Sequence, residues 1–348
     1  MRRLPVGYQR ASAHSPAWSL GCTEVRRAGM PVGEVQTSSS TNALRSRGSE
    51  TFGGATVLVG VLAGVPEGGP GVDTGGIPRA AAALGHRAVV VDVSSATVAV
   101  VRDVGADAWI TRFAGLSAGY ALSAEAESAV AVVLNRSEPV RVASDQLATL
   151  DRWRRCGLPI PLSIAIEPDT GWVEAADRLS VPFVVKRADT TGGSGVHLVA
   201  TADEFASVVD PYRARGARLL GQQFLGDTAG RDLRIMVVGG VVVAAMRRRA
   251  LREGEWRANL QLGGRGVPVK PSHRQKRLAL AACAAVGLDV AGVDLLDRPD
   301  GRDTLLEINP QPGRRIERVC GVDVPAEVVR LAEARLQASR SSPRRAEL

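Results

Sequence analysis

The chain has 348 residues, a net charge of +8 and a hydrophobic content of 45%, which is enough for two or three domains with cores of their own. No apolar run approaches the roughly 18 residues of a membrane span, and four widely spaced cysteines without a CxxC pair argue against a zinc site or a disulfide scaffold and favour a reducing cytoplasm. The positive charge suggests an anionic partner, but aromatic residues make up only 4% of the chain and offer few stacking surfaces for single-stranded nucleic acid. We therefore expect a cytoplasmic protein that binds neither a membrane nor nucleic acid.

Both ends of the chain lack a pattern that could bury a core. Residues 1–50 contain seven arginines and three glutamates among Ser, Gly and Pro, so 1–52 are predicted to form a disordered basic tail. An Arg- and Ser-rich transit peptide is an alternative for this segment, and a start codon placed too far upstream is another. Residues 336–348 have a similar composition and are predicted to form a second disordered tail.

An α/β domain is predicted for residues 53–142. Apolar runs at 57–65 and 86–93 predict two strands, and the Ala-rich segment 77–84 predicts a helix between them. This β-α-β order is typical of parallel α/β domains, and the absence of a GxGxxG motif argues against a dinucleotide site. A further buried strand is expected at 129–135.

A second domain is predicted for residues 143–335, beginning with a helix that Ser144 caps and that ends at Cys156. A glycine-rich hairpin follows at 181–200, with the sequence TTGGSG in its loop and Lys186 at the end of its first strand. Glycines allow backbone N–H groups to close on a phosphate without Cβ clashes. The loop is not a Walker A motif, because no GK[ST] and no helix follow it. It is interpreted either as a flap over a triphosphate or as an ordinary flexible hairpin.

The segment 232–250 predicts another hairpin, with the Gly-Gly pair after Val238 as its two-residue turn. Counting from that turn places Asp232 opposite Arg247, with Arg234 on the same face as Asp232. Such a charged row can be a solvated sheet edge. Arginine is also the residue best suited to hold a γ-phosphate or a carboxylate with two hydrogen bonds.

Two more polar residues follow at a spacing of two, Arg257 and Asn259 in the segment 253–264. If that stretch is extended, both side chains reach the same place. A helix predicted from Pro271 to Gly287 then leads into the last hairpin.

The last hairpin is the most informative stretch, with the sequence VDLLDRPDGRDTLLEINPQPG. If Leu296 pairs with Leu305, Asp294 lies opposite Glu307, and the period of two adds Asn309 to the same face. Two carboxylates and an amide are hard oxygen donors of the kind that Mg²⁺ prefers. The alternative is a surface hairpin with solvated acids, but Glu307 lies within an apolar run, where burying an acid without a partner is costly.

Taken in order, these pieces resemble the ATP-grasp ligases, and most closely the RimK-type glutamate ligases. The resemblance covers about residues 130–335 and implies an α+β ATP-grasp fold, preceded by a pre-ATP-grasp α/β domain. The motifs that carry it are PFVVK before the glycine loop, DLR at 232–234 with VVGG and VVAAMRR, R-x-N at 257–259, GLDVAGVDLL at 287–296 and EINPQPG at 307–313.

The resemblance implies that ATP lies between two subdomains, of which about 160–222 form a lid. A substrate carboxylate would attack the γ-phosphate, and an amine would convert the resulting acylphosphate into an amide, by placement and charge neutralisation. The implied nucleotide-binding residues are Lys186, Gly192, Gly193, Gly195, Gln223, Phe224, Asp232 and Arg234. The residues implied to steady the reacting groups are Arg257 and Asn259. The implied ligands of Mg²⁺, or of Mn²⁺ in its place, are Asp294, Glu307 and Asn309.

Two positions depart from the family pattern. Gln146 stands where the family usually has a lysine that reaches the nucleotide phosphates, and Gln223 stands where it usually has an acid in the adenine-side strand. Both changes remove a charge from the implied nucleotide site.

The sequence therefore predicts a Mg-ATP-dependent carboxylate–amine ligase that adds an amino acid such as glutamate to a carboxylate-bearing peptide or small metabolite. A catalytically degenerate ATP-grasp module that binds nucleotide or a partner is the first alternative, and the changes at Gln146 and Gln223 favour it. A nucleic-acid-binding protein is the second alternative, and it rests only on the excess of arginine. The sequence leaves homo-oligomerisation open.

Overall fold

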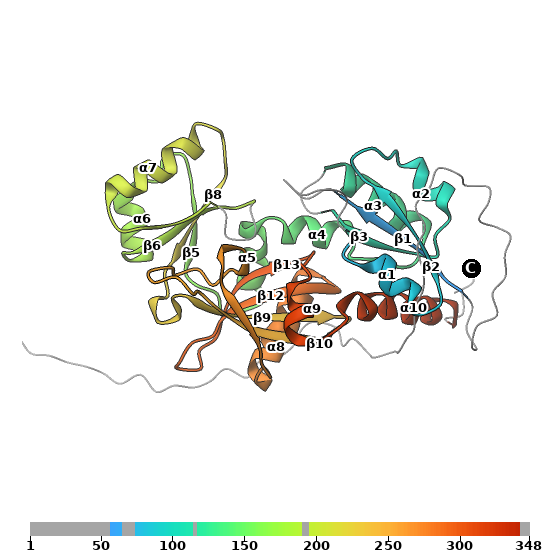
Figure 1. The fold of residues 1–348 in the computed structure, drawn as a ribbon. Coiled ribbons are helices and arrows are strands. Elements are labelled where there is room, and N and C mark those ends of the chain that lie inside the picture. Colours follow the sequence, from blue (N-terminus) through green and yellow to red (C-terminus); the bar gives the residue numbers. More distant parts are fainter. Residues whose placement is uncertain (1–55, 65–73, 114–116, 190–194, 342–348) are drawn as a thin grey trace, which may run out of the picture.

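The computed structural model describes residues 56–64, 74–113, 117–189 and 195–341. These residues form three sheets (Figure 1). The first sheet lies at the right of the view, the second at the upper left, and the third below the centre, where it adjoins both. The tail predicted at 1–52 lies outside the described residues.

The first sheet is parallel, with the strand order β2-β1-β3-β4. Its centre is closely packed, since a Cβ on Gly60 of β1 would lie 2.2 Å from Cε3 of Trp109 on β3. The strand predicted at 129–135 is only two residues long, because the preceding helix runs to Ala129. The strands are β1 (Leu58–Ala63), β2 (Arg87–Asp92), β3 (Ala108–Arg112) and β4 (Val133–Leu134), and their helices are α1 (Ile77–Ala82), α2 (Ala99–Val104) and α3 (Ser117–Ala129).

The C-terminal helix α10 (Val324–Ser341) returns to the first sheet and packs along α1 (Figure 1). Its buried face includes Val328, Ala332 and Leu336, which recur at a four-residue spacing and so lie on one side of the helix. The disordered tail predicted from residue 336 is therefore wrong for residues 336–341, which continue this helix. Residues 342–348 lie outside the described part of the chain.

The second sheet is antiparallel, with the strand order β5-β8-β6-β7. Trp172, Phe183 and Phe205 form an aromatic group between this sheet and its two helices. The elements are β5 (Ser163–Ile166), α6 (Trp172–Leu179), β6 (Phe183–Arg187), β7 (Val196–Val199), α7 (Ala202–Arg213) and β8 (Leu219–Gln223).

The third sheet is antiparallel, with the strand order β11-β10-β9-β12-β13. The apolar residues of β9 and β12, such as Leu233, Val293 and Leu295, share a core with Ala279 and Cys283 of the helix α8, which covers this face. The opposite face carries polar side chains at one end, such as Asp232 and Arg234, and apolar ones at the other, where Met236, Val238 and Ala244 join the core of the first sheet. The elements are β9 (Arg231–Val238), β10 (Val241–Arg249), β11 (Arg265–Pro268), α8 (His273–Val286), β12 (Val290–Leu296) and β13 (Thr304–Asn309).

Short helices connect the three sheets. Asp145, rather than the predicted Ser144, caps α5, because its carboxylate accepts the backbone N–H groups of Leu147 and Ala148. Trp153 of this helix donates its indole N–H to the carbonyl of Ala282 in α8 at 3.1 Å. The connecting helices are α4 (Ser137–Ala143), α5 (Gln146–Arg155) and α9 (Arg315–Cys320), with short 3-10 turns at Gly226–Thr228 and Leu260–Leu262.

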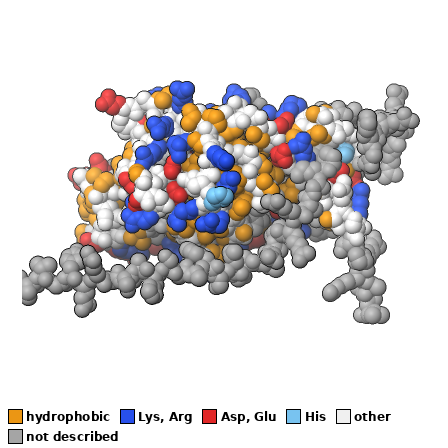
Figure 2. All heavy atoms as spheres, turned by 90° about the horizontal axis from the view of Figure 1, so that it is seen from below, with side chains coloured by type: hydrophobic (Ala, Val, Ile, Leu, Met, Phe, Trp, Pro, Cys, Tyr) orange, Lys and Arg blue, Asp and Glu red, His pale blue; other side chains and the backbone are white. Residues whose placement is uncertain are grey.

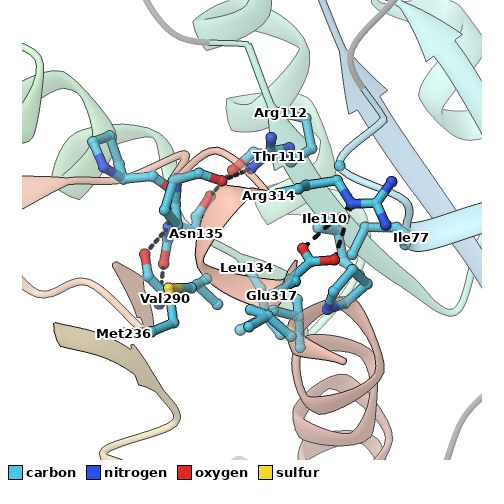
Figure 3. A pocket seen from close by; sticks show the side chains of 16 residues that line it. Ile77, Ile110, Thr111, Arg112, Leu134, Asn135, Met236, Val290, Arg314 and Glu317 are labelled. Atoms are coloured by element: carbon cyan, nitrogen blue, oxygen red, sulfur yellow. Dashed lines mark hydrogen bonds and ion pairs between the residues drawn. The ribbon is translucent and has the colours of Figure 1, made fainter. Parts of the chain in front are cut away.

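Asn135, directly after β4, joins the first sheet to the third (Figure 3). Its buried amide donates to the carbonyls of Val290 and Pro310 at 2.8 and 3.0 Å. Its side-chain oxygen accepts the N–H groups of Asp289 and Val290 at 2.9 and 2.8 Å. A small cavity of about 410 Å³ lies beside this junction. Because the Asn135 side chain makes four buried hydrogen bonds, it holds the end of β4 in a fixed position against the start of β12.

The surface carries its charges in mixed form. Figure 2 shows lysine and arginine side chains interspersed with acidic and hydrophobic ones over the face seen from below, rather than in one continuous basic stripe. None of the described helices combines the length and apolar character needed to cross a membrane.

Candidate active-site cleft

A cleft of about 830 Å³ opens between the second and third sheets. Gly195, Arg234 and Asn309 are not among the lining residues, and Gly192 and Gly193 fall outside the described part of the chain. The predicted site residues that do line the cleft are Lys186, Gln223, Phe224, Asp232, Arg257, Asn259, Asp294 and Glu307.

The hairpin β12–β13 places two carboxylates side by side. Asp294 pairs with Glu307, as predicted, although the predicted pairing of Leu296 with Leu305 is wrong. Leu305 pairs with Leu295 instead, and the extra residue Leu306 forms a β-bulge between the two pairs. The bulge therefore compensates for the error of one residue in the predicted register.

Asp294 is buried and bound by two arginines. Arg234, opposite it on β9, donates from Nε to Oδ1 and from Nη2 to Oδ2, the latter at 2.8 Å. Arg248 of β10 also donates to Oδ2, at 2.8 Å. Burial by itself would raise the pKa of Asp294, but the two guanidinium groups outweigh it and hold the pKa below its ordinary value. Arg234 has room because position 292 is glycine, where a Cβ would lie 2.6 Å from Nη1 of Arg234.

The partner of Asp232 differs from the prediction. Val238 and Val241 pair across the turn as expected, but Asp232 lies opposite Arg248 rather than Arg247. The reason is a second bulge, since the register shifts between Val242 and Ala244 and leaves one extra residue on β10.

Arg248 binds Asp232 with two hydrogen bonds of 2.6 Å and is buried with it. The pKa of Asp232 is raised by burial and by the charge of Asp294, and Arg248 only partly offsets this. Arg248 is a site residue that the turn-based count missed. The run of three arginines at the end of β10 was the available signal, but a count from the turn selects the wrong one.

Glu307 faces the cleft without a partner of its own, since no described residue makes a hydrogen bond or ion pair with its carboxylate. Burial and the neighbouring charge of Asp294 raise its pKa. The third predicted ligand, Asn309, pairs with Gly292, and its side-chain oxygen accepts the N–H of Gln311 at 2.9 Å.

Two carboxylates that face an open cleft fit a magnesium ion. Among the described residues, no group of three or more His, Cys, Asp or Glu side chains is placed to hold a metal. Mg²⁺ does not need such a cage, because it is usually bound through one or two carboxylates together with phosphate oxygens of the substrate. Asp294 and Glu307 would supply the two carboxylates.

Lys186 reaches the cleft from the second sheet. Its Nζ donates to Oε1 of Gln222 at 3.1 Å, and Nε2 of Gln222 donates to Oγ of Ser163 at 3.0 Å. Burial lowers the pKa of Lys186 to about 8, against the opposing effect of Glu307. Sequence reasoning missed Gln222 as the residue that orients this lysine. Gln222 and Gln223 are adjacent in the sequence, and only the tertiary structure shows which of the two faces Lys186.

Arg257 and Asn259 both line the cleft, as predicted, but the segment that carries them is irregular rather than a strand. Arg257 forms two hydrogen bonds of 2.9 Å with Glu255, and its guanidinium lies 5.7 Å from the ring centroid of Trp256. Trp256 in turn contacts Phe224 edge to face at 5.6 Å. Trp256 is therefore an aromatic wall of the cleft that the sequence did not single out.

Residues 155–332, more than half of the chain, match the family described as the RimK-like ATP-grasp domain. The chain belongs to this family. It is 37% identical over 206 residues to the ribosomal protein bS6–L-glutamate ligase of Escherichia fergusonii, which covers 58% of this chain and 67% of that protein. It is 35% identical over 283 residues to a "probable alpha-L-glutamate ligase" of Sodalis glossinidius, covering 76% and 93%.

The fold agrees with solved ATP-grasp ligases. The ATP-grasp ligase PsnB, complexed with a minimal precursor, Mg and ADP, superposes with a TM-score of 0.61 at 20% identity over 83% of this chain and 100% of that chain. The RimK-like relatives form carbon–nitrogen bonds at the expense of ATP, so this protein is an ATP-dependent ligase of the same class.

Both departures from the RimK-like pattern lie in the cleft. Gln146 begins α5, and its backbone N–H donates to the carbonyl of Ala188 at 2.8 Å, which ties the helix to the end of β6. Gln223 ends β8, and its backbone N–H donates to the carbonyl of Leu162 at 2.8 Å. The structure thus places both neutral side chains in the lining of the cleft.

Proposed function

We propose that this protein is a Mg-ATP-dependent ligase that joins the carboxylate of a peptide or small metabolite to the amine of an amino acid such as glutamate. One observation carries the proposal. The paired carboxylates of Asp294 and Glu307 face the same cleft as Lys186, which lies on the other sheet. Anionic groups that hold a metal and a cation that binds phosphate are the two parts that phosphoryl transfer needs.

The residues of the cleft divide the work between the two sheets. Lys186, the backbone of β8 and Phe224 would bind the nucleotide from the second sheet, and Trp256 would face it from the segment that follows β10. Asp294 and Glu307 would hold Mg²⁺, which neutralises phosphate charge and polarises the γ-phosphate when it is bound. Asn309 lies outside the cleft lining and would have to reach it to join them.

The chemistry proceeds in two steps. A carboxylate oxygen of the substrate bonds to the γ-phosphorus as the bond to the β–γ bridging oxygen breaks, which gives an acylphosphate and ADP. The amine nitrogen then bonds to the acyl carbon, phosphate leaves, and the amine loses a proton to the solvent or the departing phosphate. Arg257, held by Glu255, and Asn259 lie where they could bind the transferring phosphoryl group.

The relatives support glutamate as the amino acid and a peptide as the acceptor. One is named for L-glutamate transfer to ribosomal protein bS6, and another is named as an alpha-L-glutamate ligase. Because one relative is named for a ribosomal protein, we also propose a cytoplasmic location for this protein. The expected protein partner is the acceptor peptide itself.

A coupled assay of ADP release tests this function. The purified protein is incubated with Mg-ATP and a panel of amino acids and acidic peptides, singly and in pairs. We expect ADP and phosphate in equal amounts only when an acid and an amine are both present. Formation of AMP and pyrophosphate would contradict the acylphosphate route, and release that is independent of the amine would contradict the ligase assignment.

A further inference from the structure

Arg248 lies between two carboxylates that belong to different strands. It makes two hydrogen bonds of 2.6 Å with Asp232, its direct partner on β9. Its Nη2 also donates to Oδ2 of Asp294, on β12, at 2.8 Å. One buried guanidinium thus bridges a pair of buried acids, one of which is a candidate metal ligand.

The two arginines on Asp294 are not equivalent. Arg248 and Asp294 both line the cleft, whereas Arg234 does not. Arg234 binds both oxygens of Asp294 and is its direct partner across β9 and β12. Arg248 contributes a single contact from the cleft side and would keep both bonds to Asp232 if that contact were lost. Of the two arginine contacts with Asp294, the contact of Arg248 is therefore the one that can be replaced by another acceptor for Arg248.

A divalent cation and this guanidinium compete for the same oxygen. A metal ion that approaches Asp294 from the cleft meets Nη2 of Arg248 on Oδ2, and the two positive charges repel each other. A phosphate group in the cleft changes the balance, because guanidinium binds phosphate oxygens strongly and with defined geometry.

We propose that Arg248 is a positioning residue that makes metal binding at Asp294 depend on the nucleotide. This inference rests on the proposed function. Without phosphate in the cleft, Arg248 holds Oδ2 of Asp294 and opposes the metal. With a triphosphate present, a phosphate oxygen accepts from Arg248 in place of Oδ2 of Asp294, and Oδ2 is left for the metal. Metal and nucleotide then enter as a pair.

Mn²⁺ binding, measured by electron paramagnetic resonance on the full chain, tests this role apart from turnover. We expect weak Mn²⁺ binding to the native protein without nucleotide, and binding that is about tenfold to a hundredfold tighter in Arg248→Gln, the scale of one charge-assisted contact. The gain in Mn²⁺ affinity on adding a non-hydrolysable ATP analogue should be correspondingly smaller in the variant. Arg247→Gln is the matched control, because Arg247 carries the same charge at the neighbouring position but pairs with Asp297. This variant should behave like the native protein.

A second variant covers the case in which Arg248→Gln does not fold. Asp232→Asn combined with Arg248→Gln removes the buried pair without changing the net charge, and it leaves Asp294 with Arg234. It should also bind Mn²⁺ more tightly than the native protein without nucleotide. Unchanged Mn²⁺ affinity in the folded variants, or an equal gain in Arg247→Gln, would overturn the role of Arg248. Failure of the native protein to bind the ATP analogue would instead contradict the proposed function.

Discussion

The hairpins β9–β10 and β12–β13 lie side by side in one sheet, and each contains one extra residue that breaks its register. In β12–β13 the bulge still leaves Asp294 opposite Glu307, so the pair of carboxylates predicted from the sequence is present. In β9–β10 the bulge moves the partner of Asp232 from Arg247 to Arg248. The same kind of irregularity thus preserved one predicted pair and replaced another.

The difference teaches that the two hairpins have different tasks. β12–β13 presents carboxylates to the cleft, and Glu307 has no partner among the described residues. β9–β10 supplies the arginines that neutralise the buried acids around it. We therefore expect changes in the first hairpin to act mainly on chemistry and changes in the second to act mainly on stability and metal entry.

The largest effect is expected for Asp294→Asn, which keeps the shape of the side chain but removes the charge that we propose holds the metal. Turnover should fall by about 10²- to 10³-fold, the cost of losing a preorganised charge at a reacting phosphate. The measurement is ADP release under saturating Mg-ATP. Asp297→Asn on the same hairpin is the control, because Asp297 pairs with Arg247 and does not line the cleft. More than a tenth of native activity in Asp294→Asn would remove Asp294 from the metal site.

The register of β9–β10 can be tested by comparing Arg248→Ala with Arg247→Ala. The first leaves two buried carboxylates without their shared partner and should lower the free energy of unfolding by about 3–5 kcal/mol. The second removes a partly exposed pair with Asp297 and should cost about 1 kcal/mol or less. Urea denaturation of both variants gives the two values. Equal costs, or a larger cost for Arg247→Ala, would show that the register counted from the turn is the correct one.

Gln146→Lys restores a charge on the far side of the cleft from both hairpins. A lysine near a triphosphate should tighten binding of a Mg-bound ATP analogue by about tenfold to a hundredfold. Isothermal titration of both proteins measures this, with Gln337→Lys in α10 as the control for added charge. An unchanged affinity would mean that the cations already in the cleft replace the family lysine.

The smallest effect concerns pH and Lys186, whose pKa burial lowers to about 8. Phosphate favours the charged ammonium form of Lys186. Once the pH exceeds this pKa, Lys186 of the free protein must take up a proton when the ATP analogue binds. Affinity for the ATP analogue should therefore be nearly constant below pH 7.5 and fall by up to about tenfold per pH unit above pH 8. The decline should be absent in Lys186→Met. The same decline in that variant would assign the titration to another group.

Much of the fold could be predicted because its signals are local. The apolar run of β1, the Gly-Gly turn after Val238 and the glycine that ends α8 each lie within a few residues of what they determine. The helix α10 was not predicted, and its last turn was assigned to a disordered tail. That turn is helical because Leu336 is buried against the first domain, some 250 residues earlier in the chain.

By itself, the sequence determined the family and the order of most elements, and it predicted that the candidate metal ligands Asp294 and Glu307 face each other, because their spacing along one hairpin places them opposite one another. Only the tertiary structure decided which arginine meets Asp232, that Gln222 holds Lys186, and that Asp294 is already bound by two guanidinium groups. The physical reason is that a bulge has no reliable local signal, and that counterions come from strands paired across the sheet. Candidate metal ligands can thus be recognised from the spacing of residues along the chain, whereas the charge balance around such a ligand depends on which strands become neighbours.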